Sequence, residues 1–366
     1  MIRHSLLTFT LLLNLVAITD TRSSATELFN LKKGNVELKS AGSLAFGPSN
    51  ILFVGDAKAA TIYALNTEDQ GIDGAKSYEI ENLLEKITAS TEANAEQIGD
   101  LAVNPITGNA FLSVISSGKV DIVRIAVDGS VSQLDLNGIA FSSVSLPNAP
   151  EDKVVSQGRR RNNPRDSSIT DLAYTAGRVL VAGLAAGESP SSVTEFDFPF
   201  TEKSAGFRVE IFHAAHGRNE DYAPIQTFVP FNLGNEPTLL AGYVCTPLVK
   251  IPVGKIKDQS KISGTTVAEL GNRNRPLDML VYEQHGKNFL LMSNSARGVM
   301  KISTEDLEGN TGLKERVSNG GVAGQSYETI ESLKGVVQLA KLDDRHALVI
   351  QKTDDSPMTL RSVDLP

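Results

Sequence analysis

Residues 271–303 read GNRNRPLDMLVYEQHGKNFLLMSNSARGVMKIS. A polar loop leads into an apolar run at residues 277–282, and a turn at residues 285–287 separates it from a second apolar run at residues 288–293. A glycine-bearing turn then leads into residues 299–302. Short apolar runs bounded by turn residues predict three successive β-strands. The stretch is therefore expected to form one antiparallel meander.

Weaker copies of this pattern recur along the chain. Each copy has a polar residue, a short apolar run, a turn with Gly or Asp, and further apolar strands. The copies lie near residues 41–80, 98–136, 168–213, 224–270, 276–329 and 335–365. Repeats of this length with several strands each are typical of a β-propeller. We therefore predict an all-β chain with a single propeller domain at residues 26–366, most simply with six blades and alternatively with seven.

A propeller that closes into a ring leaves no unpaired sheet edge between its ends. The N-terminal segment 36–38 and the C-terminal segment 360–365 are both short and apolar. We expect these N- and C-terminal strands to pair and close the ring.

The first 25 residues have the three parts of a secretory signal peptide. Arg3 and His4 form a basic start, residues 5–18 are apolar, and small residues precede a cleavage site after Ala25. The apolar run is shorter than the ~20 residues that span a bilayer. We therefore expect export to the periplasm or the extracellular space, without stable membrane insertion.

The charge balance restricts the partners. The chain has 35 Lys and Arg against 43 Asp and Glu, a formal net charge of -8. Binding to a phosphate backbone needs a basic excess, so nucleic acid is excluded as a partner. A monomer that binds a small polar molecule or a protein is the expectation that remains.

Three copies carry an aspartate at the same place, directly before the apolar run of the first strand. These residues are Asp100, Asp171 and Asp278, and the other copies offer Ser43, Gln338 and, in the fourth copy, Thr238. First strands line the central channel of a propeller, so these side chains should ring one mouth of it. They are expected either to bind a metal or polar ligand or to hydrogen-bond backbone amides of neighbouring blades.

A polar loop precedes the last of these aspartates. It contains Arg273, Asn274 and Arg275, and the fork of an arginine side chain suits a carboxylate or phosphate group. The loop is predicted either to form an anion-binding rim or to pair its arginines with the channel aspartates.

His213 and His216 are the one closely spaced histidine pair in the sequence. Glu220 and Asp221 follow, but a third metal ligand is not evident from the spacing. We interpret the pair as loop or surface histidines. The sequence also lacks the Cys-x-x-Cys-His, Gly-x-Ser-x-Gly and His-Glu-x-x-His motifs.

The repeats resemble those of secreted bacterial β-propellers with degenerate NHL-like or YVTN-like blades, over roughly residues 40–365. Residues 243–250 and 271–279 look like parts of a bacterial propeller family without an assigned activity. The segments 161–164 and 273–276 are loosely similar to the Arg-Asn-Pro loops of quinoprotein sugar dehydrogenases, but the catalytic His segment of that family is absent. Gluconolactonase-like propellers hold a metal with Glu, Asn and Asp, which Glu236, Asn235 and Asp278 would imitate at a different spacing.

Three functions follow as hypotheses, and whether the chain is an enzyme stays open. The first is a binding or interaction module that recognises its ligand at the channel mouth. The second is a lactonase-like or esterase-like hydrolase with a divalent cation such as calcium in the channel. The third is a quinone-dependent oxidoreductase. The candidate ligand-binding residues are Asp100, Asp171, Asp278, Arg273, Arg275, Asn274 and Glu236.

Overall fold

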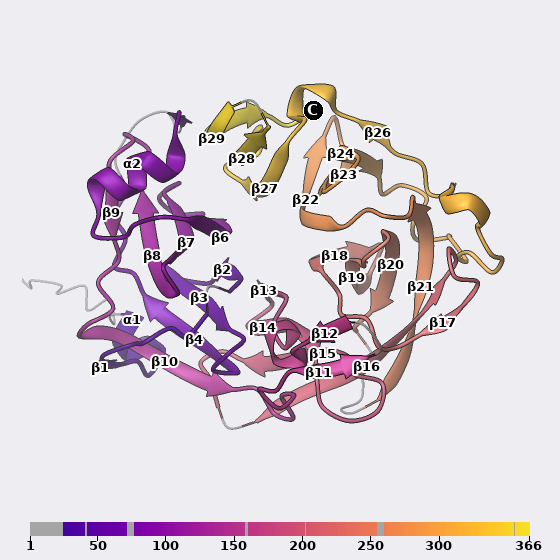
Figure 1. Cartoon of the computed structure of the whole chain (residues 1–366), viewed down its shortest axis with the longest axis horizontal. Coiled ribbons are helices and arrows are strands. Elements are labelled where there is room, and N and C mark those ends of the chain that lie inside the picture. Colours follow the sequence, from indigo (N-terminus) through magenta and orange to yellow (C-terminus); the bar gives the residue numbers. More distant parts are fainter. Residues whose placement is uncertain are drawn as a thin grey trace, which may run out of the picture.

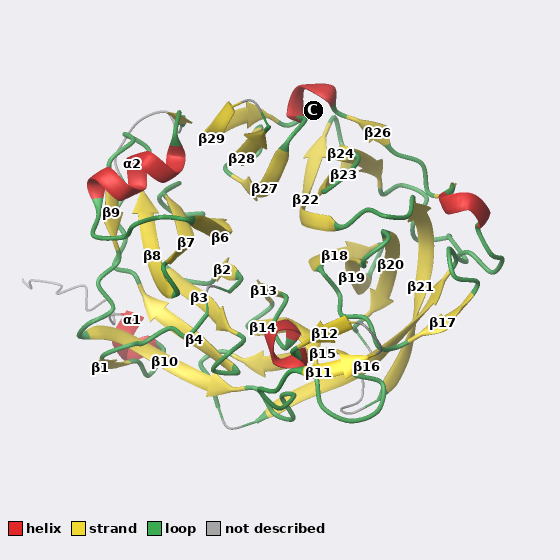
Figure 2. Ribbon diagram, in the orientation of Figure 1, coloured by secondary structure: helices red, strands yellow, loops and turns green. Residues whose placement is uncertain are grey.

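The computed structural model describes residues 25–40, 42–71, 77–157, 160–201, 203–254, 260–354 and 356–366. Antiparallel strand meanders stand around a central axis, and most of the few helices lie at the periphery (Figures 1 and 2). Among the described residues, no helix has the length and apolar character to cross a membrane. The predicted signal peptide lies outside the described residues except for Ala25.

The sheets are named here by their innermost strands. The β2 sheet has the order β1-β10-β4-β3-β2, and the β6 sheet has the order β6-β7-β8-β9. Their strands are β1 (Lys32–Gly34), β2 (Leu44–Phe46), β3 (Ile51–Asp56), β4 (Thr61–Asn66), β10 (Ile139–Ser145), β6 (Gln97–Val103), β7 (Ala110–Ser116), β8 (Lys119–Ile125) and β9 (Val131–Gln133).

The β13 sheet and the β18 sheet share an edge. Their strands are β13 (Asp171–Thr175), β14 (Arg178–Leu184), β15 (Ser191–Asp197), β16 (Ser204–His213), β17 (Arg218–Glu220), β18 (Thr227–Leu233), β19 (Glu236–Gly242), β20 (Pro247–Pro252), β21 (Lys261–Leu270) and β25 (Val322–Gly324). The outer strands β16 and β21 pair in parallel, from Arg208 with Lys261 to Ile211 with Gly264. This pairing joins the two meanders into one ten-stranded sheet.

The β22 sheet and the β27 sheet complete the arrangement. Their strands are β22 (Pro276–Gln284), β23 (Lys287–Asn294), β24 (Gly298–Ser303), β26 (Glu328–Thr329), β27 (Val336–Lys341), β28 (His346–Thr353), β29 (Ser356–Asp364) and β5 (Glu79–Ile80). Strands β22, β23 and β24 are the three that the stretch 271–303 predicts. The remaining elements are α1 (Ala25–Leu28), α2 (Leu83–Ser90), η1 (Pro164–Ser167), η2 (Ser318–Gly320), η3 (Glu331–Leu333) and the hairpin of β11 (Val155–Gln157) with β12 (Arg160–Asn162).

The innermost strands form a closed circle. Each contacts the next in the order β2, β13, β18, β22, β27 and β6, and β6 contacts β2 again. An apolar cluster fills each junction between neighbouring sheets; for example, Val181 and Phe53 pack between the β13 and β2 sheets. This is the radial architecture of a β-propeller.

The order of the sheets around the ring differs from their order in the chain. The β6 sheet lies between the first and the last meander, because the chain runs back across β5 and α2 before it forms β6. Leu83 and Ile87 of α2 are fully buried, and they pack in the apolar cluster between the β6 and β27 sheets. The chain then returns to the β2 sheet through β10, which pairs with β4.

The predicted closing pair is therefore wrong. Val36 donates its N–H to the carbonyl of Leu136, and β1 just before it pairs with β10. The C-terminal strand β29 instead pairs with β5, with Leu360 opposite Ile80. The segment that leads from the β2 sheet to α2 occupies this edge, so the segment at residues 36–38 packs elsewhere.

Candidate functional site

The three aspartates lie on alternate innermost strands. Asp100 is on β6, Asp171 is on β13 and Asp278 is on β22. In two of these strands a register shift lies directly before the aspartate, between Ile98 and Asp100 and between Pro276 and Asp278. A β-bulge of this kind re-aims the side chain that follows it.

Each aspartate hydrogen-bonds the next sheet in the same direction around the ring. Oδ2 of Asp100 accepts from the N–H of Leu44 at 2.6 Å, and Oδ2 of Asp171 accepts from the N–H of Phe228 at 2.7 Å. Asp278 accepts in the same way from the N–H of Leu339, also at 2.7 Å. The inter-blade backbone role, one of the two predicted for these aspartates, is therefore present.

Polar residues stand at the matching places on the three other inner strands. Ser43, Thr227 and Gln338 each precede the residue whose N–H binds an aspartate. The expectation for Thr238 is wrong: Thr238 lies on β19, one strand further out, and pairs with Phe231. Thr227 takes its place because β18, and not β19, is the innermost strand of that sheet.

Two cavities in the channel meet at the aspartates. The outer cavity, about 340 Å³, is lined by Ser43, Asp100, Thr170, Asp171, Gln226, Thr227, Arg275, Asp278 and Gln338 among others. The second, about 330 Å³, shares the three aspartates and is otherwise largely apolar, with residues such as Phe46, Phe228 and Met279. The carboxylates thus lie between a polar cavity and a mainly apolar one, which exposed Pro105 and Lys341 also line. No histidine is among the described residues that line either cavity.

The channel raises the pKa of all three carboxyl groups. Protein encloses them on several sides although part of each side chain still faces the channel, and this desolvation disfavours the charged form. Burial raises the pKa of Asp171 to about 6. Burial and the negative charge of Asp100 raise the pKa of Asp278 well above its usual range. Burial and the charge of Asp171 act on the pKa of Asp100 in the same direction, against its hydrogen bond from Leu44.

Gln338 connects two of the aspartates. In the amide orientation that satisfies both partners, Nε2 of Gln338 donates to Oδ2 of Asp278 at 3.0 Å and to Oδ1 of Asp100 at 2.9 Å. One neutral amide therefore bridges the carboxylates on either side of β27. A positively charged group at the same place would offset their repulsion more strongly.

Only part of the loop at residues 273–275 reaches the channel. Arg275 lines the outer cavity at its mouth and is otherwise exposed. Asn274 is buried within the loop, where its side-chain oxygen accepts from the N–H of Ala296 at 3.0 Å. Arg273 is exposed and is not among the described residues that line either channel cavity.

Asn235 and Glu236 lie at the turn between β18 and β19, whereas Asp278 lies on β22 of the neighbouring sheet. Glu236 begins β19 and pairs with Leu233 at the end of β18 that is distant from Thr227. Neither residue is among the described residues that line the channel cavities. The structure therefore does not bring Asn235, Glu236 and Asp278 together.

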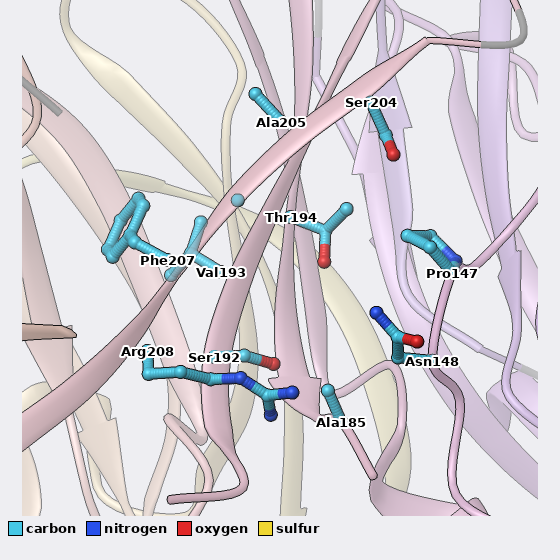
Figure 3. A pocket seen from close by; sticks show the side chains of 11 residues that line it. Pro147, Asn148, Ala185, Ser192, Val193, Thr194, Ser204, Ala205, Phe207 and Arg208 are labelled. Atoms are coloured by element: carbon cyan, nitrogen blue, oxygen red, sulfur yellow. The ribbon is translucent and has the colours of Figure 1, made fainter. Parts of the chain in front are cut away.

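A second hollow, about 240 Å³, lies over β15 and β16, away from the channel (Figure 3). Its cationic side chain is Arg208, whose Nη2 donates to the carbonyl of Ala186 at 2.9 Å. Nη1 of the same residue lies 3.5 Å from the carbonyl of Pro190. Because backbone oxygens already accept hydrogen bonds from the Arg208 guanidinium, its role in this cavity is structural. We therefore place the candidate site in the channel.

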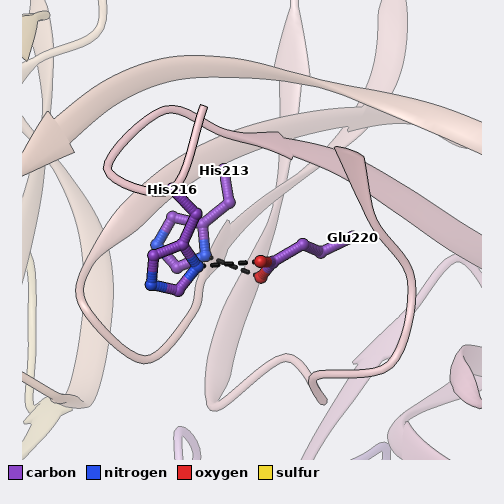
Figure 4. A group of neighbouring side chains, drawn as sticks. All are labelled: His213, His216 and Glu220. Atoms are coloured by element: carbon purple, nitrogen blue, oxygen red, sulfur yellow. Dashed lines mark hydrogen bonds and ion pairs between the residues drawn. The ribbon is translucent and has the colours of Figure 1, made fainter. Parts of the chain in front are cut away.

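The histidine pair lies at a third place, on the β16–β17 hairpin (Figure 4). His213, His216 and Glu220 have potential metal-ligand atoms within 4.8 Å of one another, and in the described part of the chain no other group of three His, Cys, Asp or Glu residues meets that distance. Glu269 of β21 lies beside His213 and is absent from the sequence prediction. It lies far from the histidines in the chain, and only the pairing of β16 with β21 brings it close.

Comparisons with known proteins show distant likenesses in shape. No protein-family model and no curated protein sequence matches the chain. The PQQ-bound aldose sugar dehydrogenase from Streptomyces coelicolor is 10% identical, with 91% of this chain and 96% of that chain covered and a TM-score of 0.38. Streptogramin B lyase is 10% identical, with 92% and 97% covered and a TM-score of 0.37. A putative glucose dehydrogenase from Thermus thermophilus is 12% identical, with 91% and 100% covered and a TM-score of 0.36. We take no activity or cofactor from such distant neighbours.

Proposed function

We propose that this chain is an exported, six-bladed β-propeller that acts as a binding module, and that it takes a small polar ligand into the channel mouth. The observation that carries the proposal is the position of Asp100, Asp171 and Asp278 between the two channel cavities. The outer cavity, at about 340 Å³, falls within the range of small-molecule sites, about 300–1,000 Å³.

The charges of this cavity favour a zwitterionic ligand. The carboxylates lie at its inner end and repel one another, so an ammonium group placed there would be stabilised. Arg275 lies at the mouth, where its guanidinium suits the anionic end of the same ligand. The hydroxyl groups of Ser43 and Thr227, which donate to the carbonyl of Thr170 and to the carboxylate of Asp171, add acceptor oxygens to the cavity wall. An amino acid or a similar small amphoteric molecule fits this order of charges.

The two enzyme alternatives have weaker support. A hydrolase with a divalent cation in the channel would use the same aspartates, but Oδ2 of each already accepts a backbone N–H of the next sheet. The described residues that line the channel cavities include no histidine that could act as a general base. None of these lining residues points specifically to a quinone. Calcium is therefore kept as a competing occupant in the test.

The test is a thermal-shift screen with the twenty amino acids, simple amines, simple sugars and calcium chloride. We expect an amino acid or a related zwitterion to raise the melting temperature of the wild type and not that of Asp278→Asn, in which an acceptor oxygen remains for Leu339. A shift produced by calcium alone would support the hydrolase alternative. No shift from any compound, or the same shift in the variant, would contradict the proposed ligand site.

Export is a separate part of the proposal, supported by the tripartite sequence of the first 25 residues. The mature protein is expected to begin at Thr26. N-terminal sequencing of the protein from the exported fraction checks this, and an N-terminus at Met1 would contradict it.

A further inference from the structure

Four side chains from two meanders meet on the outside of the ring. His213 ends β16, His216 lies in the following turn, and Glu220 ends β17 (Figure 4). Glu269 comes from β21 of the neighbouring meander, and its Oε1 accepts from the N–H of Ala215 in the same turn at 3.0 Å. The cluster therefore lies beside the parallel pairing of β16 with β21, and none of its members is among the described residues that line the channel cavities.

Glu220 holds both imidazole rings. Its Oε2 is 2.9 Å from Nδ1 of His213, and its Oε1 is 2.8 Å from Nδ1 of His216. Arg218 donates Nε to Oε1 at 2.9 Å, so Glu220 already has a cationic partner beside it. A carboxylate accepts but does not donate, so each Nδ1 carries the shared proton. Nε2 of each ring is then the nitrogen that faces away from Glu220, as Figure 4 shows.

Two buried atoms of this cluster lack a hydrogen-bond partner. They are Nε2 of His213 and Oε2 of Glu269, and the side chains are only 6% and 1% exposed. A buried polar group without a partner is unfavourable, because it has lost its hydrogen bonds to water without gaining others. The other oxygen of Glu269, Oε1, lies 4.0 Å from Nε2 of His213, which is too long for a hydrogen bond between them.

We propose that this cluster binds one divalent first-row transition ion, with zinc as its representative, through Nε2 of His213, Nε2 of His216 and the carboxylate of Glu269. The ring centroids of the two histidines are 4.0 Å apart, and the Nε2 atoms of both rings lie on the side of the cluster away from Glu220 (Figure 4). Nε2 of His213 and Oε1 of Glu269 are 4.0 Å apart, longer than the roughly 3.4 Å between two ligands of a tetrahedral zinc ion with bonds of about 2.0–2.2 Å. Glu269 is not in the group of three whose ligand atoms lie within 4.8 Å of one another, so its carboxylate would move toward the histidines when the ion binds.

Glu220 is a positioning residue of this site. A histidine that binds a metal commonly donates its other ring N–H to a carboxylate, which fixes the tautomer and the ring orientation. Glu220 does this for both histidines at once. The His216 side chain is 44% exposed, which leaves a route for the ion and a place for a water ligand. The bound ion would tie the β16–β17 hairpin to β21.

The test is calorimetric titration of ZnCl₂ into chelator-treated protein that carries no polyhistidine tag, together with visible absorption of the Co²⁺-loaded protein. The wild type is expected to bind one equivalent and to give the d–d bands of a cobalt ion with nitrogen and oxygen ligands. His216→Asn and Glu269→Gln should weaken zinc binding by more than the 10–100-fold that is typical for loss of an orienting partner. Gln at position 269 keeps an acceptor for the N–H of Ala215, and His216 is partly exposed, so both variants should fold.

The matched control is His346→Asn. Nδ1 of His346 lies 2.9 Å from Oδ1 of Asp343, but the pair is on the surface, at 31% and 38% exposed. This variant should bind zinc as the wild type does. The proposal is overturned if the wild type gives neither binding heat nor a cobalt spectrum, or if the control weakens binding as much as His216→Asn. Unchanged binding in Glu269→Gln would remove that residue from the ligand set and would also contradict the proposal.

Discussion

Oδ2 of Asp278 on β22 accepts the N–H of Leu339 on β27 at 2.7 Å. The same carboxylate faces both channel cavities. Asp100 and Asp171 repeat this relationship with Leu44 and Phe228. The groups that would bind a ligand are thus also the groups that join neighbouring blades, so stability and binding need to be measured separately in every variant.

Asp278→Ala is expected to lower the free energy of unfolding by about 1–3 kcal/mol, because the buried N–H of Leu339 loses its acceptor. Asp278→Asn should cost less, since its amide oxygen can still accept that hydrogen bond. Urea denaturation of both variants measures the difference. Asp344→Ala is the control, because its side chain is 96% exposed and its pair with Lys341 is on the surface. Equal losses in Asp278→Ala and Asp344→Ala would show that the bond to Leu339 contributes nothing measurable.

The raised pKa of Asp171 makes stability depend on pH. Its usual pKa of 3.8 applies to the unfolded chain, and burial raises the pKa to about 6 in the folded protein. Between these values the folded state holds more protons, so the contribution of Asp171 to stability falls as pH rises through this window. Below this window the Asp171 carboxyl group is protonated in both states, so burying it costs no charge desolvation. Above the window it is ionised in both states, and the folded protein bears the full cost of burying the charge.

Asp171→Asn removes this dependence because its amide does not titrate. Urea denaturation from about pH 4 to about pH 7.5 should show the wild type losing stability relative to the variant mainly up to about pH 6. A smaller change is expected near pH 7, where Asp100 titrates, because the charge of Asp171 also raises the pKa of Asp100. The hydrogen bond to Phe228 changes the offset between the two curves but not their relative slope. Parallel curves over the whole range would show that the carboxyl group titrates normally in the folded protein.

Deletion of residues 360–366 is expected to destabilise the whole ring. The deletion removes Leu360, which lies opposite Ile80 of β5, and Pro366, whose carbonyl accepts from Nζ of Lys301 at 2.6 Å. The β27 sheet would lose both its pairing with β5 and this hydrogen bond to the neighbouring β22 sheet. Thermal unfolding measures the effect, and a melting temperature equal to that of the full chain would show that this edge is not part of a closed ring.

The sequence predicts the common position of the three aspartates better than it predicts the ring closure. Asp100 and Asp171 each precede Leu-Ala in an apolar run, so the repeat itself reveals their common register. The fourth copy has a less regular pattern. Its sequence predicts a strand over residues 224–231 and another over residues 238–244, and the expected polar residue, Thr238, lies on the second of these. The residue at the matching place in the structure is Thr227, which begins β18.

The features that the sequence does not reveal depend on contacts between distant segments. β5 has two residues, too few for a periodic signal, and its pairing with β29 decides how the ring closes. Glu269 approaches His213 only because β16 and β21 pair in parallel. Local periodicity carries no information about either contact.

The central claim is that the channel aspartates bind the ammonium end of a zwitterion and Arg275 binds its anionic end. Calorimetric titration of the best amino acid from the screen, near pH 6.5 and in two buffers with different heats of ionisation, tests it most directly. Burial raises the pKa of Asp100 to about 7, so part of the protein carries a proton there at this pH, and the wild type should bind one equivalent and release protons to the buffer. Asp278→Asn and Arg275→Gln should each weaken binding at least about tenfold, which is about 1.4 kcal/mol, and Asp278→Asn should also release fewer protons. Binding of equal strength in the wild type and both variants, with the same heat in both buffers, would contradict the account.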